Sequence, residues 1–274
     1  MLLSRRALGL VPLAFAFPFP RVPVAELEPL ELRLLPLEHP TLLALPRAVE
    51  HPVPLVVLLH GLGETGAPLL GARAWVDRYG LATSVARLQN PPLAQESLRN
   101  DWGNALAEAN ALLAARPYRG LAFACPHVPY MPVGQLDAYT RWIADSLIPR
   151  VRAEAGPALD GALPRLAGCS YGGWASLEVL LRAPDRFSAW AGIQTALSIP
   201  SARAYGERLA RLSPRPLLVQ TSLLDPFHDP SLILASGLRT RKVACDLRVL
   251  PGPHDQPWLR EAGTPMALLW LDCL

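Results

Sequence analysis

The sequence is poor in lysine, in charge overall and in long apolar runs, and the last two shortages each exclude a class of protein. Of the 26 basic residues, 25 are arginine and one is Lys242, which we attribute to codon usage rather than to chemistry. Only 18% of the 274 residues are charged, and 51% are hydrophobic, enough to bury a sizeable core, so intrinsic disorder is excluded. No uncharged run reaches the ~18 residues that a membrane-spanning helix needs. The 19 glycines have no period, which excludes a collagen-like fibre.

The small positive charge is confined to one end of the chain. The formal net charge is +3, but residues 1–25 hold three arginines and no acid, so the remainder has 23 basic and 23 acidic residues. Binding to nucleic acid or to an anionic membrane surface requires a basic stripe, which a balanced chain does not provide. We therefore expect neither nucleic acid nor an anionic membrane surface as a partner, and the sequence leaves the oligomeric state open.

The first 25 residues have the pattern of an export signal. Arg5 and Arg6 are followed by the uncharged, mostly apolar run Ala7–Pro20, whose 14 residues suit a signal peptide better than a membrane span. The twin arginines predict the Tat route, which exports folded proteins, and the segment Ala14–Ala16 is a passable cleavage site. The prediction is a periplasmic or secreted protein; the alternative is an apolar N-terminal arm on a cytoplasmic one.

Four cysteines allow at most two disulfides, and nothing in the sequence selects a pairing. Cys125 and Cys245 lie in or beside apolar runs, so we expect buried free thiols.

After the leader, short apolar runs alternate with longer amphipathic stretches, a pattern typical of a mostly parallel sheet with helices on both faces. We predict a single α/β domain over residues 26–274. The expected strands are 31–35, 42–49, 53–60, 120–125, 163–169, 189–193, 216–221 and 243–250, and the expected helices are 103–115, 136–154, 172–182, 230–238 and 258–271. The segments 62–72, 89–103 and 126–135 are rich in proline and glycine and are predicted loops after strands, where such sheets place their binding crevice.

The sequence GCSYG at 168–172 matches the G-x-S-x-G pattern between a predicted strand and a predicted helix. A turn that lifts a serine above the sheet edge brings neighbouring backbone too close for side chains, which explains the flanking glycines. Centring the pattern on Cys169 would require glycine at Ala167 and Tyr171, so Ser170 is the candidate nucleophile and Cys169 a buried neighbour.

To act as a nucleophile, a serine hydroxyl needs a base and an acid that orients this base. In proteins with this motif, the acid and then the histidine follow the serine in the chain. His254 follows the last predicted strand, and Asp225 follows the strand before it, 29 residues earlier. Asp229 is the reserve acid. His228 also follows Ser170, but one short loop is a poor source of both partners, so we interpret it as a surface histidine.

Acyl transfer also requires donors for the developing oxyanion, usually two backbone N–H groups. One is expected from Tyr171, directly after the nucleophile, and the other from Leu62, in the loop that ends the strand 53–60. His60 is expected to hold that loop in shape.

The same loop also matches G-x-G-x-x-G, the dinucleotide-binding fingerprint. That fingerprint needs a helix to begin within the glycines, whereas Pro68 and its small neighbours favour a loop, and no suitable acid ends a second strand ~20 residues later. We expect no cofactor, and the chain has no HExxH, paired CxxC or Walker motif that would predict a metal or nucleotide site. Trp75, Trp102, Tyr130 and Met131 lie in post-strand segments, with packing favoured over pocket lining.

Four features together resemble the esterase branch of the α/β-hydrolases. They are the His-Gly loop, the GCSYGG turn, the Asp225-Pro-Phe turn and the PGPHD ending, with Trp258 four residues after the histidine. That branch includes esterase D, S-formylglutathione hydrolase, feruloyl and enterochelin esterases and the mycolyltransferases. The resemblance runs from about Leu55 to Leu271, but the segment from Gly63 to Trp102 has no counterpart in it. It implies an α/β-hydrolase fold, Ser170, Asp225 and His254 as a catalytic triad, and Leu62 and Tyr171 as the oxyanion hole.

The function expected from these residues is hydrolysis of a small carboxylic ester through an acyl-enzyme on Ser170. Two alternatives stay open: an acyltransferase that uses the same acyl-enzyme, and a non-catalytic envelope binding protein on a hydrolase scaffold. The sequence does not name the acyl or alcohol part of the substrate.

Overall fold

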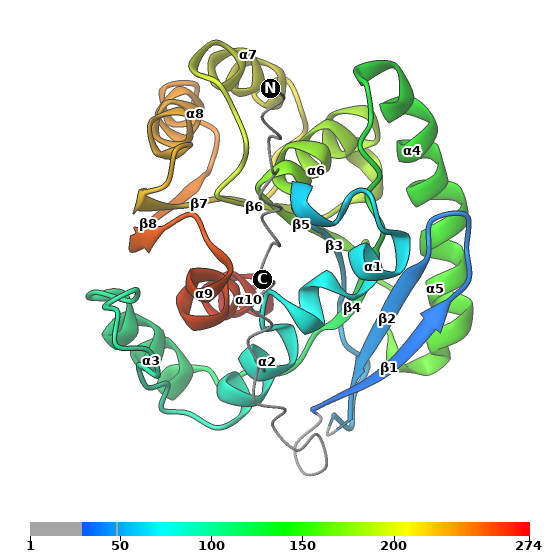
Figure 1. The fold of residues 1–274 in the computed structure, drawn as a ribbon, viewed down its shortest axis with the longest axis horizontal. Coiled ribbons are helices and arrows are strands. Elements are labelled where there is room, and N and C mark those ends of the chain that lie inside the picture. The colour runs from blue at the N-terminus through cyan, green and yellow to red at the C-terminus, as the bar shows by residue number, and fades with distance from the viewer. Residues whose placement is uncertain (1–28, 48) are drawn as a thin grey trace, which may run out of the picture.

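The computed structural model describes residues 29–47 and 49–274, and these residues form one eight-stranded sheet in the order β1-β2-β4-β3-β5-β6-β7-β8 (Figure 1). The strands are β1 (Leu30–Leu35), β2 (Thr41–Pro46), β3 (Leu55–Leu59), β4 (Ala122–Pro126), β5 (Arg165–Cys169), β6 (Ala189–Ile193), β7 (Leu217–Leu224) and β8 (Asp246–Pro253). Strand β2 is antiparallel to both β1 and β4, and all other neighbours are parallel. The mostly parallel sheet is therefore confirmed.

Helices cover both faces of this sheet, also as predicted (Figure 1). One face packs against α4 (Leu136–Trp142), α5 (Ile148–Ala155), α6 (Tyr171–Arg182), α7 (Ile199–Leu209) and α8 (His228–Thr240). The other packs against α1 (Pro68–Asp77), α2 (Leu81–Gln89), α3 (Ala105–Ala115), α9 (Gln256–Trp258) and α10 (Thr264–Asp272).

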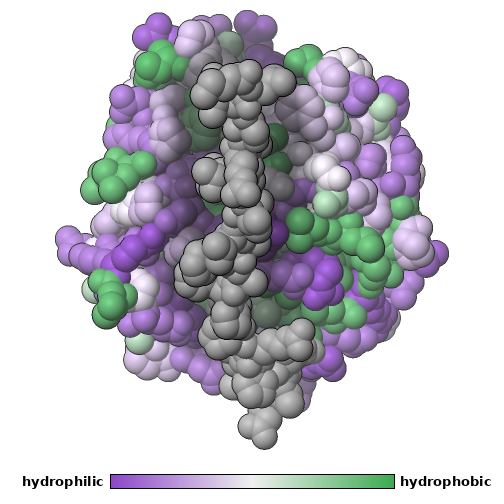
Figure 2. Space-filling view, viewed as in Figure 1, coloured by the Kyte–Doolittle hydropathy of each residue, from purple (hydrophilic) through white to green (hydrophobic). Residues whose placement is uncertain are grey.

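The central strand β3 shows why its sequence has no polar alternation. Leu55, Val57 and Leu59 belong to one hydrophobic core, whereas Val56 and Leu58 belong to the other. A strand covered by helices on both faces buries every side chain, so it appears in the sequence as a continuous apolar run. On the face shown in Figure 2 the surface is by contrast mostly hydrophilic, with hydrophobic residues gathered in a few places.

The prediction of a loop over 62–72 is wrong in its second half, because α1 begins at Pro68. Proline has no N–H to donate and a fixed φ that suits a helix, so the first helical position accepts it without loss. The helices α2 and α7 were not predicted at all, and β8 lies three residues later than expected. The predicted helix over 136–154 is observed as α4 and α5, joined by the π-helical turn Ile143–Leu147.

The predicted export signal, residues 1–25, lies outside the described residues. Within the part of the chain that the structure describes, no helix combines the length and the hydrophobicity needed to span a bilayer. All four cysteines are free thiols, of which Cys125 is buried as expected and Cys245 is half-buried.

Candidate active site

Ser170 lies on the tight turn between β5 and α6, with φ 53° and ψ −119°. A non-glycine residue at positive φ is strained and persists only where the surrounding structure holds it in place. Here the Ser170 N–H donates to the Ile193 carbonyl at 2.9 Å. A Cβ on Gly172 would lie 2.3 Å from the carbonyl oxygens of Leu59 and His60, so this position has room only for glycine.

The imidazole of His254 joins Ser170 to Asp225. Its Nε2 lies 3.0 Å from Ser170 Oγ, and its Nδ1 lies 2.9 Å from Asp225 Oδ1. Because an ionised carboxylate only accepts hydrogen bonds, Nδ1 carries the proton and Nε2 is left as the acceptor of the serine hydroxyl proton. The structure thus brings together three side chains that lie far apart in the sequence.

Asp225 is held by its surroundings in a fixed orientation. Its side chain is fully buried, and it accepts hydrogen bonds from Thr221 Oγ1 at 2.6 Å and from the Phe227 N–H at 3.0 Å. The reserve acid, Asp229, has a 77% exposed side chain and pairs with His228 at 2.9 Å instead. The geometry therefore favours Asp225 over Asp229 as the partner of His254.

The loop after β3 passes directly beside Ser170, since a Cβ on Gly61 would lie 3.8 Å from Ser170 Cβ. Leu62 begins the short helical turn Leu62–Glu64, and Tyr171 begins α6. The first N–H groups of a helix have no carbonyl partner within it. The positions of Leu62 and Tyr171 are therefore compatible with the two donors expected for an oxyanion.

His60 fixes the shape of this loop. It is fully buried, its Nε2 accepts from the Val128 N–H at 2.8 Å, and its Nδ1 donates to the Gly61 carbonyl at 2.8 Å. Burial lowers the pKa of His60 to about 4, so the ring is neutral at pH 7. These contacts agree with the expected structural role of this histidine.

Sequence reasoning missed a second support of the loop. The hydroxyl of Tyr79 accepts from the Gly61 N–H at 3.2 Å and donates to Glu64, whose other carboxylate oxygen accepts from Arg78 at 3.1 Å. Burial, together with the nearby Cys169 and Glu64, raises the pKa of Tyr79 well above its usual value, so the hydroxyl keeps its proton. No motif marks this contact, because Tyr79 lies in the segment 63–102, which has no counterpart in the family resemblance described above.

The loop that carries His254 is also anchored by Arg99, a residue that does not line the cleft. The guanidinium of Arg99 donates to both carboxylate oxygens of Asp255, at 2.7 and 3.1 Å, and to Asp101 at 2.9 Å. Burial alone would raise the pKa of Asp255, but the hydrogen bonds from Arg99 and the Trp258 N–H hold it below its usual value. An ionised Asp255 thereby fixes the backbone next to His254.

Ser170 and His254 open into a cleft of about 270 Å³. The cleft is lined by Gly61, Leu62, Gly63, Glu64, Tyr79, Cys169, Ser170, Gln194, His254, Asp255, Gln256 and Leu259. None of these described lining residues is lysine or arginine. The aromatic candidates are not among them: Trp75 and Trp102 are buried in the core, and Tyr130 is exposed and stacked on Tyr171.

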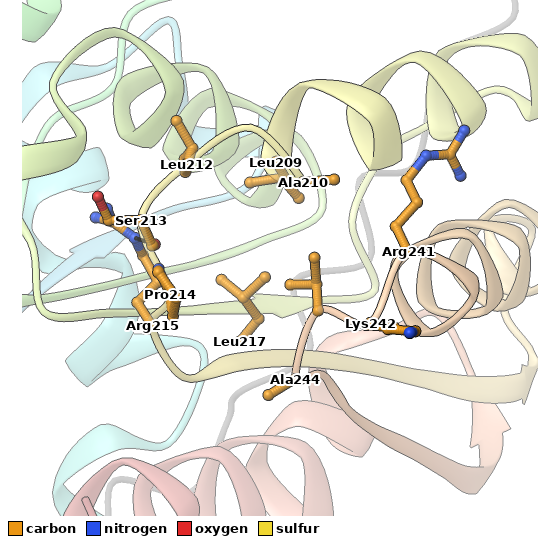
Figure 3. Close-up of a pocket in the computed structure, with 11 residues that line it drawn as sticks. Leu209, Ala210, Leu212, Ser213, Pro214, Arg215, Leu217, Arg241, Lys242 and Ala244 are labelled. Carbon is orange, nitrogen blue, oxygen red and sulfur yellow. Dashed lines mark hydrogen bonds between the residues drawn. The ribbon is translucent and has the colours of Figure 1, made fainter.

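A second cavity of about 280 Å³ lies between the C-terminal ends of α7 and α8 and the starts of β7 and β8 (Figure 3). Arg215 and Arg241 line it, but Arg215 donates to the carbonyl of Phe187 at 3.0 Å and Arg241 pairs with Glu207 at 3.2 Å. Because parallel strands start at the edge opposite to the one where they end, this cavity is remote from Ser170. We assign it no part in the chemistry.

No protein-family model matches the sequence, and no curated protein matches it. Solved structures do match in shape. A ferulic acid esterase superposes with a TM-score of 0.64 at 16% identity, over 89% of this chain and 97% of its own. S-formylglutathione hydrolase from Staphylococcus aureus gives 0.56 at 17% identity, over 89% and 96%, and enterochelin esterase from Shigella flexneri gives 0.55 at 14%, over 89% and 58%.

The sequence identities are far too low to assign a substrate to this chain, so these similarities concern the fold. They agree with the strand order, with the helices on both faces and with the sharp turn between β5 and α6. The chain therefore has the α/β-hydrolase fold, and the esterases of that fold are among the structures it resembles.

Proposed function

We propose that this protein is a serine hydrolase of carboxylic esters, with Ser170 as nucleophile, His254 as general base and acid, and Asp225 as the group that orients the imidazole. The observation that carries the proposal is the chain of contacts from Asp225 Oδ1 to His254 Nδ1 (2.9 Å) and from His254 Nε2 to Ser170 Oγ (3.0 Å). Both distances lie within the range required for proton transfer.

In the first half-reaction, Ser170 Oγ attacks the ester carbonyl carbon while His254 Nε2 takes the hydroxyl proton. The tetrahedral oxyanion accepts hydrogen bonds from the N–H groups of Leu62 and Tyr171. The C–O bond to the alcohol then breaks, and His254 gives its proton to the departing oxygen. Asp225 stabilises the transient imidazolium throughout.

In the second half-reaction, a water molecule attacks the acyl-enzyme and His254 takes its proton. Collapse of this second intermediate frees the carboxylic acid and returns the proton to Ser170. The sum of the two steps is ester plus water giving acid plus alcohol, with no redox partner.

The direct test combines labelling and turnover. A fluorophosphonate should label the wild-type protein covalently and leave Ser170→Ala unlabelled, and that variant should lose at least ~10³-fold in kcat on 4-nitrophenyl acetate. Ser213→Ala, an exposed serine remote from the cleft, is the matched control and should behave like wild type. A folded wild-type protein that is neither labelled nor active would favour the non-catalytic binding role.

For location, we propose export through the twin-arginine route, supported by Arg5, Arg6 and the apolar run that follows them. This proposal can be tested by fusing residues 1–25 to a reporter that is active only after export in the folded state. A fusion with both arginines replaced by lysine is the control. Equal export of the two fusions would contradict the proposal.

A further inference from the structure

Gln194 is held in an unusual conformation directly beside the nucleophile. It follows the last residue of β6, and its φ of 47° places it in the left-handed region, which is unfavourable for a residue with a side chain. Its N–H donates to the Gln220 carbonyl at 2.7 Å, and the carbonyl of the preceding Ile193 accepts from the Ser170 N–H. Strained residues of this kind cluster at functional sites, where the surrounding structure holds them in place.

The side-chain amide of Gln194 has a defined orientation. Its Nε2 donates to Ser222 Oγ at 2.7 Å and to the Pro253 carbonyl at 3.0 Å. A carbonyl oxygen can only accept, so the nitrogen and not the oxygen of the amide must face Pro253. Both amide hydrogens are then used, and one of them fixes the residue that precedes His254.

The amide oxygen of Gln194 remains available. Gln194 lines the cleft together with Ser170 and His254. Among the described residues no donor reaches its Oε1, and this atom is not one of the polar atoms sealed away from solvent without a partner. An acceptor with no partner among the described residues therefore belongs to a side chain that lines the cleft, although Gln194 as a whole is only 2% exposed.

Two carboxylates also line the cleft, but unlike Gln194 Oε1 they already have protein partners. The carboxylate of Glu64 binds Tyr79 and Arg78, and that of Asp255 binds Arg99. With no lysine or arginine among the described lining residues, the cleft also has no cation to pair with an anionic substrate. The chemistry that suits it is an uncharged group with a hydroxyl donor.

We propose that Gln194 Oε1 accepts a hydrogen bond from a hydroxyl on the leaving alcohol, and that the substrates are monoesters of uncharged diols or polyols. This inference rests on the ester hydrolysis proposed above. His254 protonates the departing oxygen, and the Gln194 amide is bonded to Pro253, the residue next to His254, so the side chain of Gln194 is anchored to the loop that carries the general acid. Gln194 is in this view a specificity-determining residue.

The experiment compares two esters that differ by one donor, 2-hydroxyethyl acetate and 2-methoxyethyl acetate. Wild-type protein should prefer the hydroxyl ester by about 10-fold in kcat/KM, the scale of one hydrogen bond to a neutral group. Gln194→Met keeps the length of the side chain but lacks the acceptor, and its preference should fall to within about 2-fold. Ser222→Ala is the matched control, because it removes the other partner of Nε2, does not line the cleft and should keep the preference.

The outcomes separate this inference from the function on which it rests. Equal rates of wild-type protein on the two esters would overturn it, and so would a Gln194→Met variant that loses both activities equally and keeps the preference. If Gln194→Met does not fold, Gln194→Asn replaces it: asparagine tolerates the left-handed conformation, and its shorter side chain withdraws the oxygen, so the preference should again decline. Failure of the hydrolase function itself would appear instead as unchanged 4-nitrophenyl acetate turnover in Ser170→Ala.

Discussion

Replacing Asp225 by asparagine tests the assignment of the acid, and the structure determines how the amide must lie. In the wild-type protein Oδ1 accepts from both the Phe227 N–H and His254 Nδ1, while Oδ2 accepts from the Thr221 hydroxyl. A backbone N–H can only donate, whereas a hydroxyl can donate or accept. The amide oxygen of Asn should therefore stay on the Oδ1 side, with its NH₂ group facing Thr221.

This orientation decides the size of the effect. An amide that turned its NH₂ group to the imidazole would impose the wrong tautomer and cost about 10⁴-fold. Here the Nδ1–H bond of His254 survives, and what is lost is the negative charge opposite the imidazolium. Two charges about 4 Å apart at an effective dielectric constant of about 20 attract by about 4 kcal/mol. Because the amide dipole retains part of this, we expect kcat to fall by about 10²- to 10³-fold.

The assay is steady-state hydrolysis of 4-nitrophenyl acetate from pH 5 to 9, beside Asp229→Asn as the matched control. Asp229 is exposed and bonded to His228, so its replacement should change kcat by less than about 2-fold. A loss in Asp229→Asn that equals or exceeds the loss in Asp225→Asn would refute the assignment. A loss near 10⁴-fold in Asp225→Asn would refute the deduced amide orientation alone.

Three further predictions follow from individual contacts. Gly172→Ala should abolish activity or folding, because the added Cβ would lie 2.3 Å from backbone oxygens. The control Gly66→Ala has open space around its Cβ, so its thermal midpoint should stay within about 3 °C of wild type. Arg99→Ala frees the loop after the histidine and should lower kcat by about 10-fold with little change in KM, while Leu98→Ala, fully exposed next to it, should not. Burial lowers the pKa of His60 from 6.5 to about 4, so the unfolded chain takes up this proton first, and the free energy of unfolding should fall by up to about 3 kcal/mol as the pH drops through this window. Urea denaturation at pH 7 and pH 4 checks it, and a His60→Gln variant with the same pH dependence as wild type would contradict it.

The three residues of the proposed triad could be predicted because each one directly follows a strand. The carboxyl ends of neighbouring parallel strands meet at one edge of the sheet, so β5, β7 and β8 bring Ser170, Asp225 and His254 together once the strand order is known. The local pattern is a strand followed by a polar residue in a Gly- or Pro-rich turn. Where it recurs along the chain, it predicts which distant residues lie close together in the fold. The same logic predicted the position of Leu62 at the end of β3.

Local patterns failed where one residue permits two structures. Pro68 interrupts an apolar stretch, which suggests a loop, yet the same residue is well suited to the first position of a helix. The choice is made by burial of Ala74 and Trp75 against the sheet, a tertiary contact that the sequence does not display. The helix α2 was missed in the same segment, and its buried residues Val85 and Leu88 pack in the same core.

Gln194 and Arg99 could not be predicted for a different reason: their roles exist only through partners far away in the chain. Gln194 contacts Pro253 across 59 residues, and Arg99 contacts Asp255 across 156. Both partners flank His254, so the loop of the histidine is held from two sides by residues that no motif marks. A motif reflects the residue types that a short segment needs for its own conformation. A contact between two distant residues constrains only those two residues, so it leaves no pattern in either segment. We therefore expect variation at Gln194 or Arg99 to alter specificity or turnover while the motif around Ser170 stays intact.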